Sequence, residues 1–190
     1  FSKELVDTYK IEVLTLNFDV RNIKEVQAAV DSIPEKWRKI NVLVNNAGLA
    51  VGLNTIQDGV LDDWERMIDT NVKGLLYMTR TIAPLMIANK SGHIVNLGSI
   101  AGKEVYANGN VYCATKHAVD ALSKSMRIDL LPHHIKVTAI HPGMVETEFS
   151  IVRFKGDEDR AQSVYKGLQP LLAKDIAETI YWTASRPPHV

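Results

Sequence analysis

Short apolar segments alternate with longer amphipathic segments along most of this chain. The apolar segments predict β-strands at residues 11–18, 42–44, 93–97 and 135–140. The amphipathic segments, in which apolar side chains recur at spacings of three and four, predict helices at residues 23–33, 62–89, 110–131 and 175–184. Strands that alternate with helices favour a parallel sheet that is buried on both faces. The right-handed crossover rule then predicts an α/β fold with an open, doubly wound, Rossmann-like parallel sheet.

Two of the predicted helices carry further local signals. Asp62-Asp63-Trp64-Glu65 resembles a capping box at the start of the helix at 62–89, and Pro84 is expected to bend that helix. In the helix at 110–131 we expect Tyr112 and Lys116 along the edge of the apolar stripe. The stripe itself consists of Val111, Thr115, Ala118, Leu122 and Met126.

Composition excludes several classes of protein. The 190 residues fit one domain, residues 1–190, and 46% apolar with 23% charged residues is ordinary for a globular protein. Lys plus Arg and Asp plus Glu both number 22, so no charge surplus attracts nucleic acid or an anionic membrane. No apolar stretch is long enough to span a membrane, and no signal-like segment is present. We expect a soluble, cytoplasmic protein with a small-molecule partner.

Polar and glycine residues follow the predicted strands at their carboxyl ends. They are Asp19, Asn45 to Gly48, Gly98-Ser99 and Pro142-Gly143. Ligands of open parallel sheets bind at that edge, so we expect these residues to meet around a bound molecule.

Tyr112, Lys116, Ser99 and Asn71 are the residue types of a proton-transfer site. Tyr112 and Lys116 are one helical turn apart, so their side chains would project from the same face of the helix. A nearby ammonium group favours the phenolate and is expected to bring the tyrosine pKa down from about 10. Ser99 would offer its hydroxyl to the same reacting oxygen. We expect Tyr112 to act as a general acid or base.

Taken together, these residues resemble the short-chain dehydrogenase/reductase family over almost the whole chain. The matching parts are Asp19-Val20, Asn45-Asn46-Ala47-Gly48, Asn71, Ser99, Tyr112 with Lys116, and Pro142-Gly143 followed by Thr147. The resemblance implies that Tyr112 is the general acid or base, Lys116 holds the cofactor ribose, Ser99 orients the substrate and Asn71 supports a proton relay. It also implies a dinucleotide-binding role for Asp19, Val20, Asn46, Ala47, Gly48, Tyr112, Lys116, Pro142, Gly143, Val145 and Thr147.

One part of the family pattern is absent. The glycine-rich turn that holds the pyrophosphate does not occur near residue 1, and Gly48 and Gly52 lie in the wrong place to replace it. Without the strands of that unit, the predicted strands at 11–18 and 42–44 would have unpaired edges. We expect a chain truncated at both ends, lacking the first β-α-β unit and the last strand.

A closer similarity within the family concerns residues 147–157 and 108–112, which resemble the NADP-dependent 3-hydroxy acid dehydrogenases, enzymes that oxidise serine and related acids. Arg153 is the candidate partner of a substrate carboxylate, with Lys155 as a weaker one. The cofactor is expected to be NADP, with NAD not excluded. Alternatives are a 3-oxoacyl-thioester reductase, a polyol dehydrogenase, or a non-catalytic dinucleotide sensor. The family pairs the helices at 62–89 and 110–131 between subunits, which implies a homodimer or homotetramer.

Other chemically capable residues have simpler interpretations. Cys113 is expected to be a small buried thiol, and His133-His134 to be a solvated pair at a helix end. His141 is expected to pack or to make a hydrogen bond after a buried strand. Neither the histidines nor the single cysteine indicates a metal site. Glu146 and Glu148 alternate along one segment, but the surrounding pattern disfavours a hydrolase.

Overall fold

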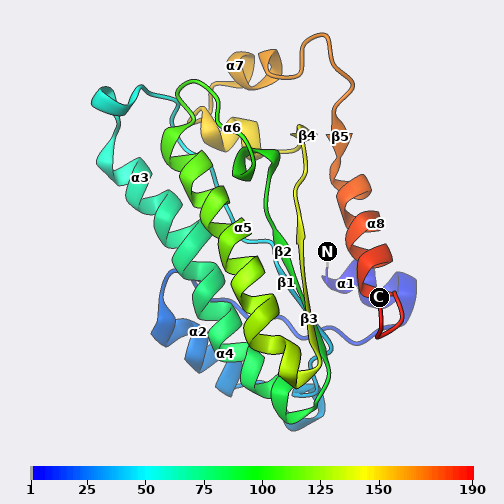
Figure 1. The fold of residues 1–190 in the computed structure, drawn as a ribbon. Helices are drawn as coiled ribbons and strands as arrows, with labels where there is room; N and C mark the ends of the chain where they lie inside the picture. Colours follow the sequence, from blue (N-terminus) through cyan, green and yellow to red (C-terminus); the bar gives the residue numbers. More distant parts are fainter. Residues whose placement is uncertain (1) are drawn as a thin grey trace.

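The computed structural model describes residues 2–190 and has a three-stranded parallel sheet at its centre (Figure 1). The strands are β1 (Val42–Asn45), β2 (Gly92–Leu97) and β3 (Ile135–Ile140), in the order β1-β2-β3. Val42 pairs with His93 and Gly92 pairs with Ile135, so all three strands run in one direction. The predicted α/β fold with a parallel sheet is therefore confirmed.

Helices cover the sheet unequally on its two faces. The long helices α4 (Leu75–Ala88) and α5 (Asn110–Leu130) pack against one face, while α8 (Ala173–Ala184) and α1 (Ser2–Tyr9) lie on the other side (Figure 1). The core between sheet and helices includes Met86, Ile94 and Val119, all almost fully buried. The central strand β2 is buried on both faces as predicted. In β1, Val42 and Val44 are 39% and 38% exposed, so one face of that strand is open.

The prediction of a strand at residues 11–18 is wrong. This segment is irregular in the structure, between α1 and α2 (Ile23–Asp31). A β-strand is stabilised by hydrogen bonds to a neighbouring strand, and within residues 2–190 no strand pairs with residues 11–18. The apolar pattern alone therefore did not produce a strand. Helix α2 does form where expected, because the Asn22 side chain accepts hydrogen bonds from the backbone N–H groups of Lys24 and Glu25.

The helix predicted at 62–89 is divided into three parts. These are α3 (Leu61–Ile68), a π-helical turn (Asp69–Gly74) and α4, which continues through Pro84 to Ala88. The predicted capping box is wrong: Val60 is the N-cap residue, no side chain caps α3, and Asp63 is buried. The winding of the helix thus changes at residues 69–74, before Pro84. π-Helical turns within helices are frequent at functional sites.

The segment that follows β3 forms a cap over the carboxyl edge of the sheet. It comprises β4 (Val145–Glu146), α6 (Phe149–Arg153), α7 (Glu158–Ser163) and β5 (Leu171–Leu172), with β4 and β5 paired in parallel. Residues 145–172 are called the cap segment below, and they arch across the top of Figure 1. Tyr165 ties the segment together, because its hydroxyl donates to the Val145 carbonyl and lies 2.7 Å from the Ser150 hydroxyl. Short 3-10 turns complete the secondary structure, at Glu35–Trp37, Ile56–Asp58, Ile100–Gly102 and Leu131–His133.

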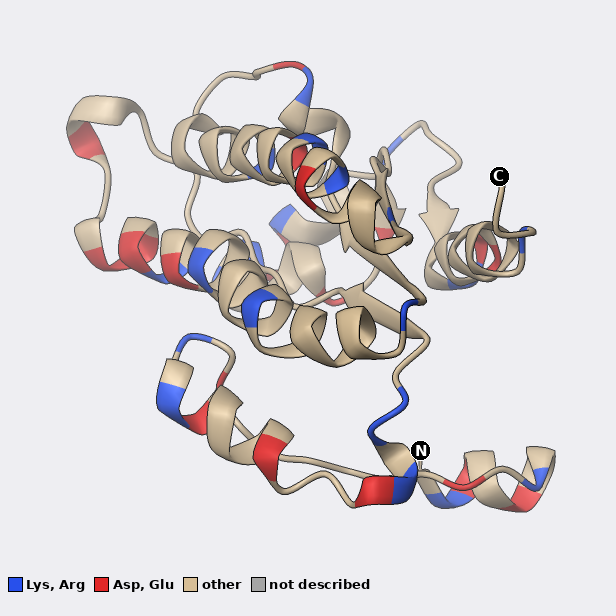
Figure 2. Ribbon diagram, turned by 60° about the horizontal axis from the view of Figure 1, so that its bottom comes forward, with Lys and Arg blue, Asp and Glu red and all other residues tan. Residues whose placement is uncertain are grey.

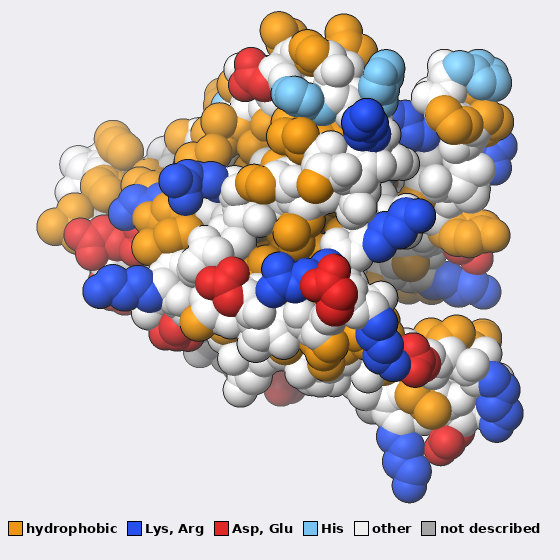
Figure 3. Space-filling view, turned by 90° about the horizontal axis from the view of Figure 1, so that it is seen from below, with side chains coloured by type: hydrophobic (Ala, Val, Ile, Leu, Met, Phe, Trp, Pro, Cys, Tyr) orange, Lys and Arg blue, Asp and Glu red, His pale blue; other side chains and the backbone are white. Residues whose placement is uncertain are grey.

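Charges of both signs are spread over the surface. Figure 2 shows basic and acidic residues along the helices, and Figure 3 shows them interspersed with apolar side chains on the face seen from below. Within residues 2–190, no helix is long and apolar enough to cross a membrane.

Candidate active site

The carboxyl ends of the three strands meet, as predicted for this edge of the sheet. The loops after β2 and β3 are joined by backbone hydrogen bonds, in which Gly98 N–H donates to the Ile140 carbonyl at 2.7 Å and Ile100 N–H to the Pro142 carbonyl at 3.0 Å. Helix α5 runs beside them, and the Lys116 ammonium donates to the Leu97 carbonyl at 2.8 Å. This junction brings the predicted residues of three separate segments together.

Tyr112 and Lys116 lie on the buried face of α5, one turn apart. The Lys116 Nζ atom is 5.9 Å from the centre of the Tyr112 ring. Both side chains belong to the buried stripe of the helix, together with Thr115 and Val119. The prediction that they lie along the edge of the stripe is therefore wrong, because the inward face is shared by polar and apolar residues.

Burial controls the titration of this pair. It raises the pKa of Tyr112 to about 12, against the opposite effect of a hydrogen bond from Ser99. It also lowers the pKa of Lys116 to about 8, since a buried ammonium loses its hydration. The expectation that Lys116 lowers the tyrosine pKa is not met here, because the loss of hydration around the phenol outweighs the nearby charges. The phenol is therefore protonated at neutral pH.

Asn71 lies in the π-helical turn and is almost fully buried. Its side-chain amide donates to the Leu49 carbonyl at 2.8 Å and to the Thr115 hydroxyl at 3.0 Å. Its side-chain oxygen accepts from Leu49 N–H at 2.8 Å. Asn71 thus joins the loop after β1 to helix α5, directly beside the Tyr112 and Lys116 turn.

Ser99 lies directly after β2, in extended backbone. Its hydroxyl oxygen accepts a hydrogen bond from Ala101 N–H at 3.1 Å, and the side chain is buried near Tyr112. The structure therefore gathers Asn71, Ser99, Tyr112 and Lys116 at one place, although they come from three segments of the chain.

The candidate cofactor residues line the adjoining open surface. Asn46, Ala47 and Gly48 are exposed after β1. A side chain at Gly48 would place its Cβ 3.3 Å from Asn71 Oδ1 and 3.7 Å from Lys116 Nζ, so glycine keeps the backbone at this point accessible.

Asp19 and Val20 lie across a groove from this loop. The groove is lined by Asn17, Phe18, Asp19, Val20, Glu25 and Ala47. The Asp19 carboxylate accepts hydrogen bonds from the Arg21 guanidinium, which lower its pKa. Val20 packs on Gly74, where a Cβ would be 3.0 Å from the valine methyl.

The remaining candidates for cofactor binding lie in the turn after β3 and at the start of the cap segment. Pro142 and Gly143 follow β3, and Gly143 has open space around it. Val145 lies in β4, and the Thr147 hydroxyl accepts from Phe149 N–H at 3.2 Å. These residues therefore connect the end of β3 to the cap segment.

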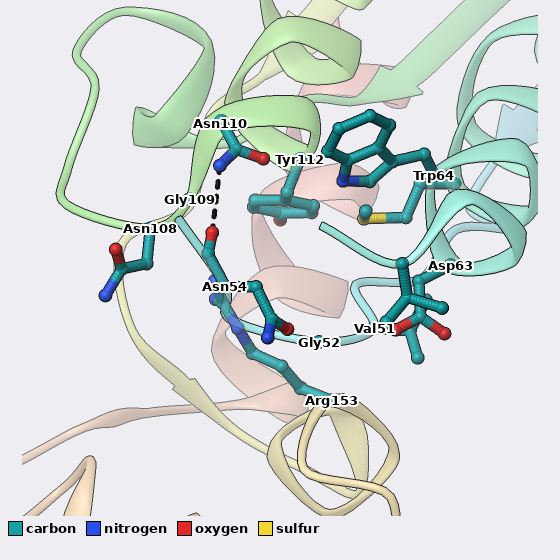
Figure 4. A pocket seen from close by; sticks show the side chains of 12 residues that line it. Val51, Gly52, Asn54, Asp63, Trp64, Asn108, Gly109, Asn110, Tyr112 and Arg153 are labelled. Carbon is teal, nitrogen blue, oxygen red and sulfur yellow. Dashed lines mark hydrogen bonds between the residues drawn. The ribbon is translucent and has the colours of Figure 1, made fainter. Parts of the chain in front are cut away.

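A small pocket opens between Tyr112 and the cap segment, with Arg153 projecting into it from α6 (Figure 4). Its lining is Val51, Gly52, Asn54, Val60, Asp63, Trp64, Met67, Asn108, Gly109, Asn110, Tyr112 and Arg153. The Arg153 guanidinium carbon is 5.5 Å from the centre of the Tyr112 ring and 5.3 Å from that of Tyr106. Within residues 2–190, the buried Nε and Nη2 atoms of Arg153 have no hydrogen-bond partner.

Lys155, the second candidate for a substrate carboxylate, does not line this pocket. Its ammonium group forms an ion pair of 2.8 Å with Asp63, a pocket residue of α3. Sequence reasoning missed Asp63, Tyr106 and Trp64 as neighbours of the site. The sequence pointed to this region through residues 108–112 and through Arg153, in both cases by the family resemblance.

Cys113 is buried as expected. Within residues 2–190, no group of three or more His, Cys, Asp or Glu side chains is placed to hold a metal ion.

The family model described as short chain dehydrogenase matches residues 1–158. The chain belongs to this family. As a short-chain dehydrogenase, it is an NAD(P)-dependent oxidoreductase that acts on a CH–OH group or the corresponding carbonyl.

Several well-described proteins are similar to this short-chain dehydrogenase. The NADP-dependent 3-hydroxy acid dehydrogenase of Salmonella typhi is 49% identical over 187 residues, which are 98% of this chain and 75% of the relative. The enzyme of the same description from Schizosaccharomyces pombe is 42% identical over 189 residues, covering 100% of this chain and 73% of the relative. A structure of serine dehydrogenase in its closed form, complexed with NADP+, superimposes with a TM-score of 0.94 at 44% identity, covering 99% of this chain and 76% of that one.

Proposed function

We propose that this short-chain dehydrogenase transfers a hydride between NADP and a small 3-hydroxy acid such as serine or 3-hydroxyisobutyrate. The observation that carries the proposal is the guanidinium group of Arg153 beside Tyr112, whose buried Nε and Nη2 atoms have no partner in the described residues. The names of the relatives, with sequence identities above 40%, support the same substrate class and cofactor.

Arg153 is suited to a carboxylate. Its Nε and Nη2 lie along one edge of the planar guanidinium group, and together they can donate two parallel hydrogen bonds to the two oxygens of one carboxylate. A buried donor without a partner costs free energy, which a bound anion would recover. The guanidinium carbon is 5.5 Å from the centre of the Tyr112 ring, so a carboxylate bound to Arg153 would lie near the phenol. A 3-hydroxy acid carries its hydroxyl only two carbons from the carboxylate carbon, so both groups can be reached at once.

The proton steps follow from the geometry of Tyr112 and Ser99. Because burial keeps the phenol protonated, Tyr112 can donate a proton to the oxygen of a carbonyl substrate, and in the oxidation direction its phenolate accepts the hydroxyl proton. Ser99 would hold the same oxygen from the other side. NADP, when bound, supplies or accepts the hydride.

We propose that NADP binds to the residues around the open loop after β1. Gly48 leaves its backbone accessible beside Lys116, and the polar groove at Asp19 and Ala47 lies next to it. This arrangement fits a ribose near Lys116 and an adenine near Asp19. Pro142, Gly143, Val145 and Thr147 are assigned to the nicotinamide side, and Val20, Asn46 and Ala47 to the adenosine side.

Other functions are less well supported. A polyol dehydrogenase or a 3-oxoacyl-thioester reductase would not need a guanidinium group beside Tyr112 with its buried Nε and Nη2 atoms free of partners in the described residues. A dinucleotide sensor would not need Asn71, Ser99, Tyr112 and Lys116 gathered at one place. The position of Arg153 therefore favours an acidic substrate.

The substitution Arg153→Ala tests the proposal. Losing a bidentate, charge-assisted contact costs about 1.5–3 kcal/mol, so kcat/KM for L-serine or 3-hydroxyisobutyrate should fall roughly ten- to a hundredfold. A neutral secondary alcohol should lose much less. Arg160→Ala is the matched control, because Arg160 lies in the same cap segment and stacks on Phe154 at 4.7 Å, away from the pocket.

The result decides between substrate classes. Equal losses on the acid and the alcohol would give Arg153 a structural role. If the parent protein turns over neither 3-hydroxy acids nor their 3-oxo products, the proposed substrate is wrong, and the alternatives should then be assayed.

We also propose that the protein is a dimer or tetramer through the helices at 62–89 and 110–131. Leu61, Ile68, Leu76 and Ile128 on these helices are exposed, although their apolar side chains favour burial. Sedimentation equilibrium of the parent and of Ile128→Glu should show a change from an oligomer to a smaller species. A monomeric parent protein would contradict this assembly.

A further inference from the structure

His141 lies directly after β3 and contacts the backbone of Ser99. Its Nδ1 atom is 3.0 Å from the Ser99 carbonyl oxygen. A carbonyl oxygen can only accept, so Nδ1 carries the proton of this hydrogen bond. The same carbonyl also accepts from Gly102 N–H at 2.8 Å. Ser99 is therefore held through its backbone by a side chain from a different strand end.

The sequence around Ser99 is adapted to this imidazole ring. A Cβ atom on Gly98 would lie 2.6 Å from His141 Nδ1, far closer than atoms can pack, so the ring occupies the space that any other residue at position 98 would fill. The backbone hydrogen bonds from Gly98 to Ile140 and from Ile100 to Pro142 lie on either side of the contact between His141 and Ser99. The histidine thus completes a set of contacts that joins residues 98–100 to residues 140–142.

The other side of the ring faces α5. His141 Nε2 is 3.4 Å from an Asp120 carboxylate oxygen, and both side chains are mostly buried. The carboxylate also accepts hydrogen bonds from Lys103 and Lys124, each at 2.7 Å. These two ammonium groups hold the pKa of Asp120 at about 2, so the carboxylate stays charged. Asp120 lies one helical turn beyond Lys116, which ties this contact to the helix that carries Tyr112.

We propose that His141, oriented by Asp120, is a positioning residue that sets the place of the Ser99 hydroxyl relative to Tyr112. This inference rests on one part of the proposed function, namely that Ser99 binds the reacting oxygen. It does not depend on which alcohol or carbonyl is the substrate. An error of about 1 Å in the position of such a group can cost two orders of magnitude in rate. A fixed carbonyl at Ser99 prevents that error by holding the backbone from which the hydroxyl projects.

Two isosteric substitutions separate the contacts of the ring. In His141→Asn the side-chain amide can occupy the place of Nδ1 and still donate to the Ser99 carbonyl. In His141→Gln the amide reaches the place of Nε2, near Asp120, and the donor to Ser99 is lost. We expect His141→Gln to lower kcat roughly ten- to a hundredfold and His141→Asn to retain several-fold more activity. KM for NADP should change little in either variant.

The test needs the purified full-length protein, the single variant Ser99→Ala and the double variant Ser99→Ala/His141→Gln. If His141 acts through Ser99, its substitution should cost almost nothing once the hydroxyl is absent, so the two losses should not add. Asp120→Asn is a second test of the same role. It should lower kcat by a smaller factor, and this loss should also be absent in the Ser99→Ala background. His133→Gln, on an exposed histidine, is the matched control. Thermal melting checks that each variant is folded.

Equal kcat values for His141→Asn and His141→Gln, or additive losses in the double variant, would overturn the positioning role while leaving the proposed function intact. Parent-like turnover by Ser99→Ala would overturn the positioning role of His141 and the part assigned to Ser99, because Ser99 would then have no part in the reaction, while the proposed substrate class would stand.

Discussion

At the scale of single residues, the site is governed by the burial of Tyr112 and Lys116. Burial raises the pKa of Tyr112 to about 12 and lowers the pKa of Lys116 to about 8, so both groups shift toward their uncharged forms. A protonated phenol is a ready proton donor to a carbonyl oxygen at neutral pH. Oxidation of an alcohol requires the phenolate and should therefore become faster as the pH rises.

The first prediction concerns Tyr112→Phe. The substitution removes the hydroxyl that exchanges the proton but keeps the ring that packs against Phe149 at 5.7 Å. We expect turnover to fall by at least about a hundredfold, because general acid–base catalysis typically contributes that much or more. Affinity for NADP should stay within a few-fold. Steady-state kinetics and a cofactor titration measure the two effects.

The matched control for this residue is Tyr77→Phe, which removes a hydroxyl from a half-buried tyrosine on α4. It should keep parent-like kinetics. Parent-like turnover by Tyr112→Phe would remove the phenol from the mechanism.

At the scale of elements, the position of Arg153 depends on how the cap segment is attached to the body of the protein. Gly52 N–H donates to the Arg153 carbonyl at 3.0 Å. Two residues further on, Lys155 pairs with Asp63 of α3 at 2.8 Å. Gly52 has φ of +73°, and a Cβ there would lie 2.8 Å from an Asp63 carboxylate oxygen. Glycine is required here both by its backbone conformation and by the closeness of Asp63.

We predict that Asp63 and Lys155 act together on Arg153. The Asp63 side chain is 5% exposed and the Lys155 side chain 56%, so removing the lysine leaves a buried carboxylate without its ion-pair partner. Lys155→Gln and Asp63→Asn should each lower kcat/KM for a 3-hydroxy acid by about tenfold, and less for a neutral alcohol, because the arginine is displaced. The double variant should be little worse than either single variant.

A double-mutant cycle on both substrates measures this coupling. Lys174→Gln is a suitable control, because Lys174 pairs with Glu178 on an exposed surface of α8. Independent losses from Asp63→Asn and Lys155→Gln would contradict the prediction.

The same elements show what sequence patterns can predict. Periodicity found β2, β3 and α5 almost residue by residue, since each has a long apolar pattern with clear turn residues at its ends. It failed at residues 11–18, where strand formation depends on a partner strand elsewhere in the chain. It also failed at Asp63, because a capping carboxylate and a buried ion-paired carboxylate look alike in sequence. The π-helical turn at 69–74 has no periodic signature of its own.

At the scale of the whole molecule, the open parallel sheet and its functional edge could be predicted because each strand ends in polar or glycine residues. The four residues Asn71, Ser99, Tyr112 and Lys116 meet as the family pattern implied. The pocket could not be predicted in the same way. Asp63, Tyr106 and Arg153 come from α3, the loop before α5 and the cap segment, and only the tertiary packing of irregular segments brings them together.

The stability of the whole fold should depend on pH through His93, at the centre of the sheet. His93 lies in β2, opposite Lys136 of β3, and is almost fully buried. Its Nε2 atom is 2.9 Å from the Thr138 hydroxyl, while its buried Nδ1 atom has no hydrogen-bond partner in the described residues. Burial lowers the pKa of His93 below its ordinary value of 6.5, and the positive charge of Lys136 lowers it further.

The sign of the effect follows from this shift. The unfolded chain binds a proton on His93 more readily than the folded protein does, so acid favours unfolding. The stability contribution of neutral His93 is complete above about pH 6.5 and is lost as the pH falls from there toward the lower folded-state pKa. For one proton the slope cannot exceed about 1.4 kcal/mol per pH unit. His93→Gln keeps a polar side chain but cannot be protonated, so its free energy of unfolding should fall less between pH 7 and pH 5.

Urea unfolding of the parent, His93→Gln and the exposed-site control His133→Gln at several pH values measures the difference. The control should follow the parent protein, because His133 is exposed to solvent just after the end of α5. If His93→Gln loses as much stability in acid as the parent, other groups are responsible for the pH dependence. The sheet would then tolerate a charged imidazole at its centre, contrary to the burial and the neighbouring lysine.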